Sequence, residues 1–225
     1  MVAGCPKQYL HIAGQSILQL SASAFLRHPQ LEHVYVVVSP EDAYVAHELR
    51  PDARLTVIYC GGATRSESVQ NGLQAIQKLL APQDWVMVHD AARPGIHAGL
   101  ISRLIDGVGD DAVGGLLALP VVDTVKLQTP AAAKNKLSTV PRAGLWLAQT
   151  PQMFRYAQLV TALQQARAGA VEITDDASAI EACGLMPLVV EGHWCNTKIT
   201  RPDDMALVET YLVKLLQTKN EPHNE

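Results

Sequence analysis

One aspartate at the end of an apolar run is the residue best placed to carry chemistry in this chain. The run at 85–89 leads into Asp90, and the local sequence reads H-D-A-A-R-P over 89–94. We expect a buried strand that delivers the Asp90 carboxylate to the crevice at the carboxyl ends of a parallel sheet, where open α/β folds bind their ligands. A carboxylate there suits a metal-bound phosphate. The alternative is that Asp90 only caps a turn and pairs with Arg93.

A glycine pair stands in the segment C-G-G-A-T-R-S-E-S at 60–68, between a predicted strand and a predicted helix. Glycine lets the backbone approach a ligand closely, and a helix N-terminus favours anions. The segment therefore predicts a binding turn that includes Gly61 and Gly62. The alternative is purely local: Thr64 and Glu67 fit a capping box, and the glycines make the turn.

Several cations, acids and hydroxyls suit a phosphorylated ligand. Lys7 directly follows Pro6, whose ring fixes the local backbone and can aim an ammonium group at a phosphate. Further such side chains stand at predicted strand ends or loop mouths, and their chemistry suits a polyol phosphate: Asp123, Thr124, Arg142, Thr150, Thr174 and Lys198. Taken singly, each of these residues is equally compatible with an ordinary solvated surface position.

The elements that must position these residues alternate between strands and helices. Runs rich in β-branched residues at 33–38, 54–59 and 85–89 are separated by helical patterns around 43–49 and 66–80. The later predicted elements are a helix at 99–107, a strand at 112–119, helices at 156–168 and from 174, strands at 187–190 and 197–200, and a helix at 202–216. This alternation predicts a doubly wound α/β fold whose mostly parallel sheet is covered on both faces.

Residues 120–152 interrupt this rhythm. The stretches 121–127 and 137–140 alternate between apolar and polar residues, and a polar, alanine-rich turn at 128–136 joins them. The pattern predicts a protruding β-hairpin arm. Because an isolated hairpin is marginally stable in water, we expect the arm to pair with a second copy in a homodimer. The alternative is a hairpin that lies on its own domain.

Composition limits the classes of protein that fit. The 225 residues are 48% hydrophobic, which suffices for one sizeable core, so we expect a single domain over 1–225. The net charge of −4, with scattered Lys and Arg, predicts no nucleic-acid partner. Apolar stretches such as 112–122 are too short for a membrane span, and the N-terminus lacks a signal pattern. The wide spacing of the cysteines argues against a zinc site or a disulfide framework, so we expect a cytoplasmic protein. The polar end at 220–225 is expected to fray.

The order of these motifs resembles the 2-C-methyl-D-erythritol 4-phosphate cytidylyltransferase family of the non-mevalonate isoprenoid pathway. The resemblance runs from Cys5 to about Tyr211. Its blocks are P-K-Q-Y at 6–9, the glycine pair with Arg65 and Ser68, H-D-A-A-R-P at 89–94, Asp123-Thr124, G-L-W at 144–146 with Q-T-P-Q at 149–152, I-T-D-D-A-S at 173–178, and K-I-T-R-P-D-D at 198–204. The H-D-A-A-R-P and L-W-x-x-Q-T-P-Q blocks are specific when they occur together in this order.

The resemblance implies a Rossmann-like nucleotidyltransferase fold and a Mg²⁺-dependent attack of the methylerythritol phosphate on the α-phosphorus of CTP, which releases pyrophosphate. Such a transfer needs positioning and charge neutralisation rather than a protein nucleophile. The resemblance also implies site roles: Lys7 stabilises charge on the triphosphate; Asp90 binds the metal; Gly62, Ala63, Ser68 and Ala91 line the cytidine pocket; Arg93, Thr124, Thr150, Thr174 and Lys198 hold the sugar phosphate; Arg142 arrives from the partner's arm.

The chain departs from the family pattern at its start. The family begins with a strand and a glycine-rich loop of the form P-A-A-G-x-G-x-R, and Met1 falls just after that arginine. We therefore expect a late start at an internal methionine or a true truncation, and a chain that is nearly inactive without this loop. Milder differences are Ala63 and Pro141, where aspartate is common, and Asp176, where glutamate is usual. Two alternatives stay open: a cytidylyltransferase for another polyol phosphate such as ribitol 5-phosphate, and an inactive binding or dimerisation subunit.

Overall fold

A four-stranded sheet forms the centre of the fold in the computed structural model, which describes residues 5–128 and 136–218. Its strands are β5 (Trp85–Val88), β6 (Gly114–Pro120), β9 (Trp146–Arg155) and β10 (Leu188–Glu191), in the order β10-β6-β9-β5. β10 runs parallel to β6, whereas β9 runs antiparallel to both β6 and β5. The α/β class is confirmed, but the sheet is mixed, because the unpredicted β9 lies between two strands of the opposite direction.

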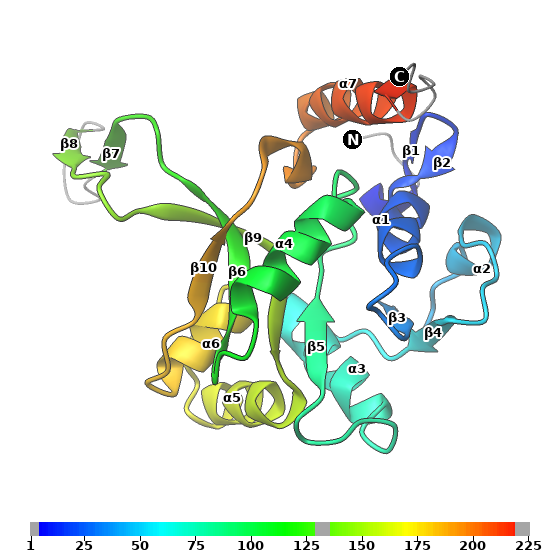
Figure 1. Cartoon of the computed structure of the whole chain (residues 1–225), viewed down its shortest axis with the longest axis horizontal. Helices are drawn as coiled ribbons and strands as arrows, with labels where there is room; N and C mark the ends of the chain where they lie inside the picture. The colour runs from blue at the N-terminus through cyan, green and yellow to red at the C-terminus, as the bar shows by residue number, and fades with distance from the viewer. Residues whose placement is uncertain (1–4, 129–135, 219–225) are drawn as a thin grey trace, which may run out of the picture.

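The predicted strands at 33–38 and 54–59 form a separate ladder. β3 (Val34–Val38) pairs in parallel with β4 (Leu55–Tyr59), and the short helix α2 (Val45–Glu48) lies between them in the sequence. Figure 1 shows this pair beyond β5, below helix α1 (Ile17–Leu26). Within the described part of the chain, no strand pairs with both β3 and β5, so the expected single sheet is in two parts.

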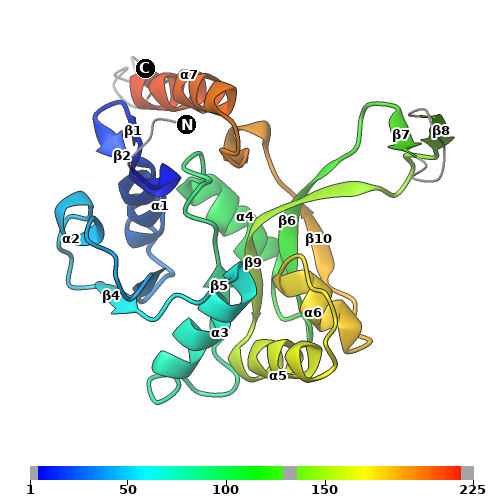
Figure 2. The same cartoon turned by 180° about the vertical axis from the view of Figure 1, so that it is seen from behind.

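Helices cover both faces of the central sheet, as the alternation predicts (Figures 1 and 2). On one face, Met87, Leu117 and Met153 contact the cluster around α4 (Ala98–Val108). On the other face, their sequence neighbours Val86, Leu116 and Phe154 contact the cluster built from three helices: α3 (Arg65–Ala75), α5 (Tyr156–Ala168) and α6 (Asp176–Ala182). The period-2 alternation of strand side chains thus divides the core into two layers.

The remaining described elements lie at the ends of the chain and in the arm. They are the 3-10 turns η1 (Lys7–Tyr9) and η2 (Trp194–Asn196), strands β1 (His11–Ile12), β2 (Gln15–Ser16), β7 (Val125–Gln128) and β8 (Leu137–Val140), and helix α7 (Pro202–Thr218). β7 and β8 pair antiparallel and protrude from the sheet, which confirms the hairpin (Figure 1). Most of the expected turn at 128–136, and the expected frayed end at 220–225, lie outside the described residues. The single domain over 1–225 stays a prediction.

The strand expected at 197–200 is wrong. This segment is extended, but its backbone contacts a loop rather than a sheet: the Ile199 amide donates to the Ala92 carbonyl at 2.8 Å. A second contact nearby joins the Cys195 thiol to the Gly95 carbonyl at 3.4 Å. The loop after β5 and the segment after η2 are therefore bound to each other.

No helix within 5–128 and 136–218 is long and apolar enough to cross a membrane.

Gly95 is predicted to be essential to this junction. A Cβ atom at this position would overlap the backbone carbonyl of Cys195, and backbone cannot move aside cheaply. We expect Gly95→Ala to lower the free energy of unfolding by about 2 kcal/mol or more, as measured by urea denaturation. Gly99→Ala is the matched control, because an added Cβ meets only the His97 side chain and α4 gains helix propensity. Equal stability of the two variants would contradict the prediction.

Candidate functional site

The Asp90 side chain lies two residues beyond the end of β5, beside β9. The backbone amide of Asp90 donates to the Thr150 hydroxyl oxygen at 3.0 Å, and Val88 pairs with Gln152 in the ladder. Thr150 is buried within β9. β9, which the sequence patterns do not predict, therefore fixes the position of the Asp90 backbone from which the carboxylate side chain extends.

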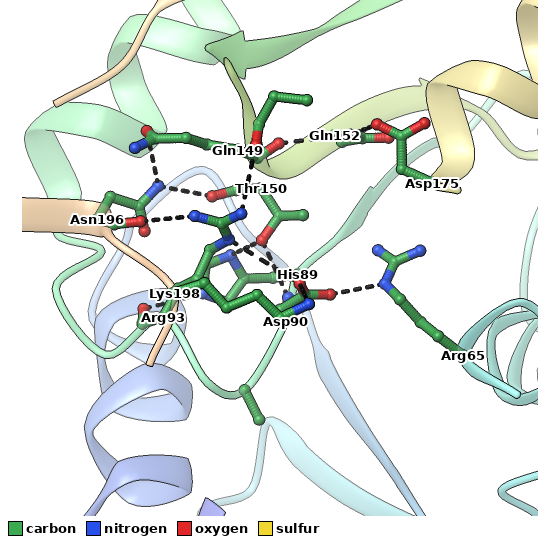
Figure 3. A network of polar contacts seen from close by, with 12 residues as sticks. Arg65, His89, Asp90, Arg93, Gln149, Thr150, Gln152, Asp175, Asn196 and Lys198 are labelled. Carbon is green, nitrogen blue, oxygen red and sulfur yellow. Dashed lines mark hydrogen bonds and ion pairs between the residues drawn. The ribbon is translucent and has the colours of Figure 1, made fainter. Parts of the chain in front are cut away.

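Three cationic side chains surround the Asp90 carboxylate (Figure 3). Arg65 Nε lies 2.6 Å from Oδ1, Lys198 Nζ lies 2.8 Å from Oδ2, and Arg93 Nε lies 3.9 Å from Oδ2. Burial alone would raise the pKa of the Asp90 carboxyl, but the charges and hydrogen bonds of Arg65 and Lys198 outweigh it and hold that pKa well below its usual range. Asp90 is therefore ionised at neutral pH. Arg93, the partner that the alternative interpretation gives to Asp90, is the most distant of the three cations.

Arg93 and Asn196 join the two loops at the site. Arg93 Nη1 donates to the Asn196 carbonyl at 2.9 Å, and Nη2 donates to the Ala148 carbonyl at 3.3 Å. Nδ2 of the buried Asn196 side chain donates to the Thr150 carbonyl at 2.7 Å. The sequence does not predict Asn196 as a site residue, because only folding brings it next to β9.

His89 is a neutral structural bridge rather than a proton-transfer group. The Arg93 carbonyl can only accept, so His89 Nε2, 3.2 Å away, carries the proton and donates to it. In the neutral ring Nδ1 is then an acceptor, and the Thr150 hydroxyl, which accepts from the Asp90 amide, donates to Nδ1 at 3.0 Å. Burial lowers the pKa of His89 to about 4, so both ring nitrogens are engaged in the neutral form.

A buried carboxylate holds Arg65 from its other end. Arg65 is the first residue of α3, and its Nη2 lies 2.8 Å from Oδ2 of Asp176, the first residue of α6. Asp176 is 0% exposed, and its Oδ1 has no hydrogen-bond partner among the described residues. Burial raises the pKa of Asp176, and the charge of Arg65 opposes that rise. The T-D-D sequence at 174–176 was a signal for this site, but it does not reveal the Arg65 contact.

The glycine turn is closed by its own helix in this structure. Thr64 Oγ1 accepts from the Glu67 amide at 3.1 Å, while the Glu67 carboxylate accepts from the Ala63 amide at 2.9 Å rather than from Thr64. The Gly62 amide donates to Ser68 Oγ at 3.0 Å. The capping alternative is thus partly right, and nucleotide binding by Gly61, Gly62, Ala63 and Ser68 stays a prediction.

Apart from the glycine turn, the predicted site residues separate into three groups. Asp90, Arg93, Thr150 and Lys198 form one polar network, and Lys7 lies close to it, since Lys7 Nζ is 3.4 Å from the carbonyl of Ile199, which follows Lys198. Ala91 lies in the same loop, where its carbonyl accepts from Ser21 Oγ at 2.8 Å.

The other two groups lie elsewhere. Asp123, Thr124 and Arg142 are exposed at the base of the arm. Thr174 lines a neighbouring pocket of about 420 Å³ together with Arg65, Arg167 and Asp175, and Arg65 is the residue that links this pocket to Asp90. The structure does not bring these four predicted residues into the Asp90 network.

The carboxylates available here fit a metal that arrives with phosphate. Within the described ranges, no three His, Cys, Asp or Glu side chains gather into a metal cage. Mg²⁺, however, is commonly held by one or two carboxylates, with substrate phosphates and water as its other ligands. Asp90 supplies one such carboxylate, and its lowered pKa keeps it charged. The site fits Mg²⁺ bound through a nucleotide.

Comparisons with known proteins agree with this geometry. The family model for 2-C-methyl-D-erythritol 4-phosphate cytidylyltransferase matches residues 1–214. The proteins of this name from Nitrosospira multiformis and Bordetella pertussis are 47% and 48% identical over 211 residues; the matches cover 92% and 93% of this chain, and 89% and 90% of those proteins.

Two solved structures share the fold. A crystal structure of 4-diphosphocytidyl-2C-methyl-D-erythritol synthase has a TM-score of 0.83 at 40% identity and covers 92% of this chain and 94% of its own. The 2-C-methyl-D-erythritol 4-phosphate cytidylyltransferase of Francisella tularensis has a TM-score of 0.79 at 33% identity, with coverages of 92% and 93%. On the combined evidence of the site, the sequence matches and the fold, this chain belongs to the 2-C-methyl-D-erythritol 4-phosphate cytidylyltransferase family.

Proposed function

We propose that this chain transfers the cytidylyl group of CTP to 2-C-methyl-D-erythritol 4-phosphate at the carboxyl end of β5. The products are 4-diphosphocytidyl-2-C-methyl-D-erythritol and pyrophosphate. The observation that carries this proposal is the ionised Asp90 carboxylate among Arg65, Arg93 and Lys198. Family membership supplies the identity of the two substrates.

The transfer requires neutralisation of the phosphate charges rather than a general base. An oxygen of the polyol phosphate forms a bond to the α-phosphorus of CTP, and the bond from that phosphorus to the departing pyrophosphate breaks. The attacking oxygen is already ionised at neutral pH, so no side chain needs to remove a proton. This agrees with a neutral His89 whose two ring nitrogens are engaged. Preorganised cations provide the main stabilisation in such transfers.

The cationic residues have a division of roles in this proposal. Arg93 and Lys198 bind the polyol phosphate, and Lys7 stabilises the charge that develops on the triphosphate. The resemblance also assigns Thr150 to that phosphate, but its hydroxyl would first have to exchange its hydrogen bond with His89 for one to the phosphate. The support for Lys7 is its position beside Ile199, next to Lys198. The three cations gathered around Asp90 provide the positive charge that attracts phosphates.

Asp90 is the residue that would hold Mg²⁺ here. Bound there, the ion supplies Lewis-acid neutralisation of phosphate charge. The nucleoside of CTP is assigned to Gly61, Gly62, Ala63, Ser68 and Ala91, by resemblance to the family. In this structure the Gly62 and Ala63 amides are bonded to Ser68 and Glu67, so a base that uses these amides must exchange with those side chains.

The arm is proposed to act in a homodimer. It leaves the central sheet, as Figure 2 shows, and it exposes apolar side chains: Leu127 is 59% and Leu137 is 62% exposed. A second copy would cover this surface. By resemblance to the family, Arg142 on the arm is assigned to the polyol phosphate in the partner's site. Asp123 and Thr124 are assigned to the polyol phosphate. A cytoplasmic location is also proposed, because Cys5, Cys60, Cys183 and Cys195 are all free thiols.

Asp90→Asn is expected to abolish most of the metal-dependent activity. The substitution removes the charge that would hold Mg²⁺ while keeping the side-chain volume, and we expect the rate of pyrophosphate release to fall by about 100-fold or more. Chelation by EDTA should stop the wild-type reaction, and added Mg²⁺ should restore it. Asp106→Asn makes the same change on the exposed surface of α4 and serves as the control. A wild-type rate in Asp90→Asn would refute the role of Asp90.

Substrate preference separates the proposed function from its alternatives. With CTP and Mg²⁺, we expect kcat/KM for 2-C-methyl-D-erythritol 4-phosphate to exceed that for ribitol 5-phosphate by about 10-fold or more. The two polyols differ in their carbon skeletons, and a site whose contacts match one skeleton stabilises the transition state of the other less well. Pyrophosphate release measures both. A reversed preference would favour the other polyol phosphate. Turnover with neither would favour an inactive binding or dimerisation subunit.

Complementation tests whether two copies share each site. Lys7→Ala and Arg142→Ala should each be inactive alone. In a mixed dimer, one of the two sites receives both wild-type residues. Random mixing makes about half of the dimers mixed, so about a quarter of wild-type pyrophosphate release should return. Co-expression of the two variants with different affinity tags isolates the mixed dimer. No recovery in that dimer would mean that the arm serves its own subunit.

A further inference from the structure

We propose that Arg65 is a positioning residue, held by Asp176, which fixes the orientation of the Asp90 carboxylate for the metal-bound nucleotide. This inference rests on the proposed function. Neither Arg65 nor Asp176 is among the residues that the family resemblance assigns to metal, nucleotide or polyol phosphate. Their role follows from the contacts between three side chains that the fold brings together from α3, α6 and the loop after β5.

The guanidinium of Arg65 bridges two carboxylates at once. Its Nε lies 2.6 Å from Asp90 Oδ1, and its Nη2 lies 2.8 Å from Asp176 Oδ2. A planar guanidinium offers several donors in a fixed geometry, whereas a lysine ammonium is a single point charge on a flexible chain. In Figure 3, Arg65 approaches Asp90 from the side opposite to Lys198. The two cations therefore hold one carboxylate oxygen each.

Asp176 has no evident task other than holding Arg65. The N-terminus of α6 is capped by Asp175 and Ser178, which form a complete capping box, so the helix does not require Asp176 for its cap. A fully buried carboxylate is costly unless it is paired. Arg65 is the partner of Oδ2, and Oδ1 has no hydrogen bond within the described residues. Burial without other partners marks Asp176 as the anchor of the arginine.

The anchor itself is rigidly placed by β9. Gln152 Oε1 accepts from the Ala177 amide at 2.7 Å, and Gln152 Nε2 donates to Asp175 Oδ2 at 2.7 Å. Gln152 is 1% exposed. The first turn of α6 is thereby bound to the strand that also carries Thr150, the acceptor for the Asp90 amide. The backbone and the carboxylate of Asp90 are thus positioned from the same strand.

Arg65 and Lys198 are not equivalent in this arrangement. The Lys198 side chain is 37% exposed, and its ion pair within the described residues is with Asp90 alone. It can leave the carboxylate for a phosphate without leaving a buried charge unpaired elsewhere. Arg65 cannot do so, because its departure would leave Asp176 buried and uncompensated. Arg65 therefore stays on Asp90 Oδ1 while Lys198 exchanges partners.

The experiment compares Arg65→Lys, Asp176→Asn and their double variant with the wild-type chain. Four quantities are measured: the Mg²⁺ concentration for half-maximal pyrophosphate release, KM for the polyol phosphate, the affinity for CTP with Mg²⁺ by calorimetry without polyol phosphate, and the thermal midpoint. Asp176→Glu keeps the anchoring charge and is the conservative rescue. Arg167→Lys is the matched control, because Arg167 lines the neighbouring pocket and donates to Gln70 at 3.2 Å but forms no ion pair with Asp90 or Asp176 within the described residues.

We expect both single variants to raise the required Mg²⁺ concentration and to weaken Mg²⁺-dependent CTP binding by about 10- to 100-fold, as removal of outer-shell partners of metal ligands does. KM for the polyol phosphate should not change. The double variant should be no worse than Arg65→Lys alone, because Asp176 acts through Arg65. Asp176→Glu and Arg167→Lys should behave as wild type.

Unchanged Mg²⁺ dependence and CTP binding in Arg65→Lys and Asp176→Asn, with only a lower thermal midpoint, would overturn the proposal and leave a purely structural ion pair. Additive losses in the double variant would equally refute action through Arg65. If Arg65→Lys does not fold, the comparison of Asp176→Asn with Asp176→Glu carries the same test. Failure of the proposed function is distinguishable, since it would show as absent turnover by the wild-type chain with either polyol phosphate.

Discussion

The ionised carboxylate of Asp90 is the constraint on which the rest of this site depends. Its side chain is only 11% exposed, and a buried charge of this kind persists only where opposite charges and hydrogen bonds compensate it. The compensation comes from Arg65 on α3, Lys198 on the segment before α7, and the nearby Arg93. The fold must therefore bring three distant segments to one point, and the packing of both helical layers serves that requirement.

β9 is the element that organises this meeting. Thr150 fixes the Asp90 backbone, Gln152 fixes the start of α6, and Asn196 bonds back to the Thr150 carbonyl. The same strand extends to Trp146, which pairs with Pro120 where the arm leaves the sheet. A single strand thus joins the core, the polar network and the base of the arm. This structural role accounts for the presence of one antiparallel strand among strands that otherwise run in the same direction.

The fold could be predicted where its signals are local. Runs of β-branched residues predict β3, β4 and β5 within one or two residues, and alternation predicts the hairpin of β7 and β8. β9 escaped prediction because Gln149, Thr150 and Gln152 are polar, although all three are buried and hydrogen-bonded. The alternation at 197–200 is typical of a strand, but its hydrogen-bond partner is a loop. Asp90, Arg93 and Lys198 could be predicted singly, whereas Asn196 and the pair of Arg65 with Asp176 depend on contacts that no local pattern encodes.

The separation of these contacts along the chain also determines when the site can exist during synthesis. Arg65 and Asp176 lie 111 residues apart, and Arg93 and Asn196 lie 103 residues apart. A nascent chain that has released β5 presents Asp90 without Lys198, and the carboxylate cannot be buried in its final surroundings until nearly the whole polypeptide has emerged from the ribosome. Contacts between residues so far apart in the sequence slow folding, because the chain loses loop-closure entropy before these contacts can stabilise it. The polar network therefore cannot form before the segment that carries Lys198 has been synthesised, and an intact site reports that α3, β9, α6 and the segment after η2 have folded together.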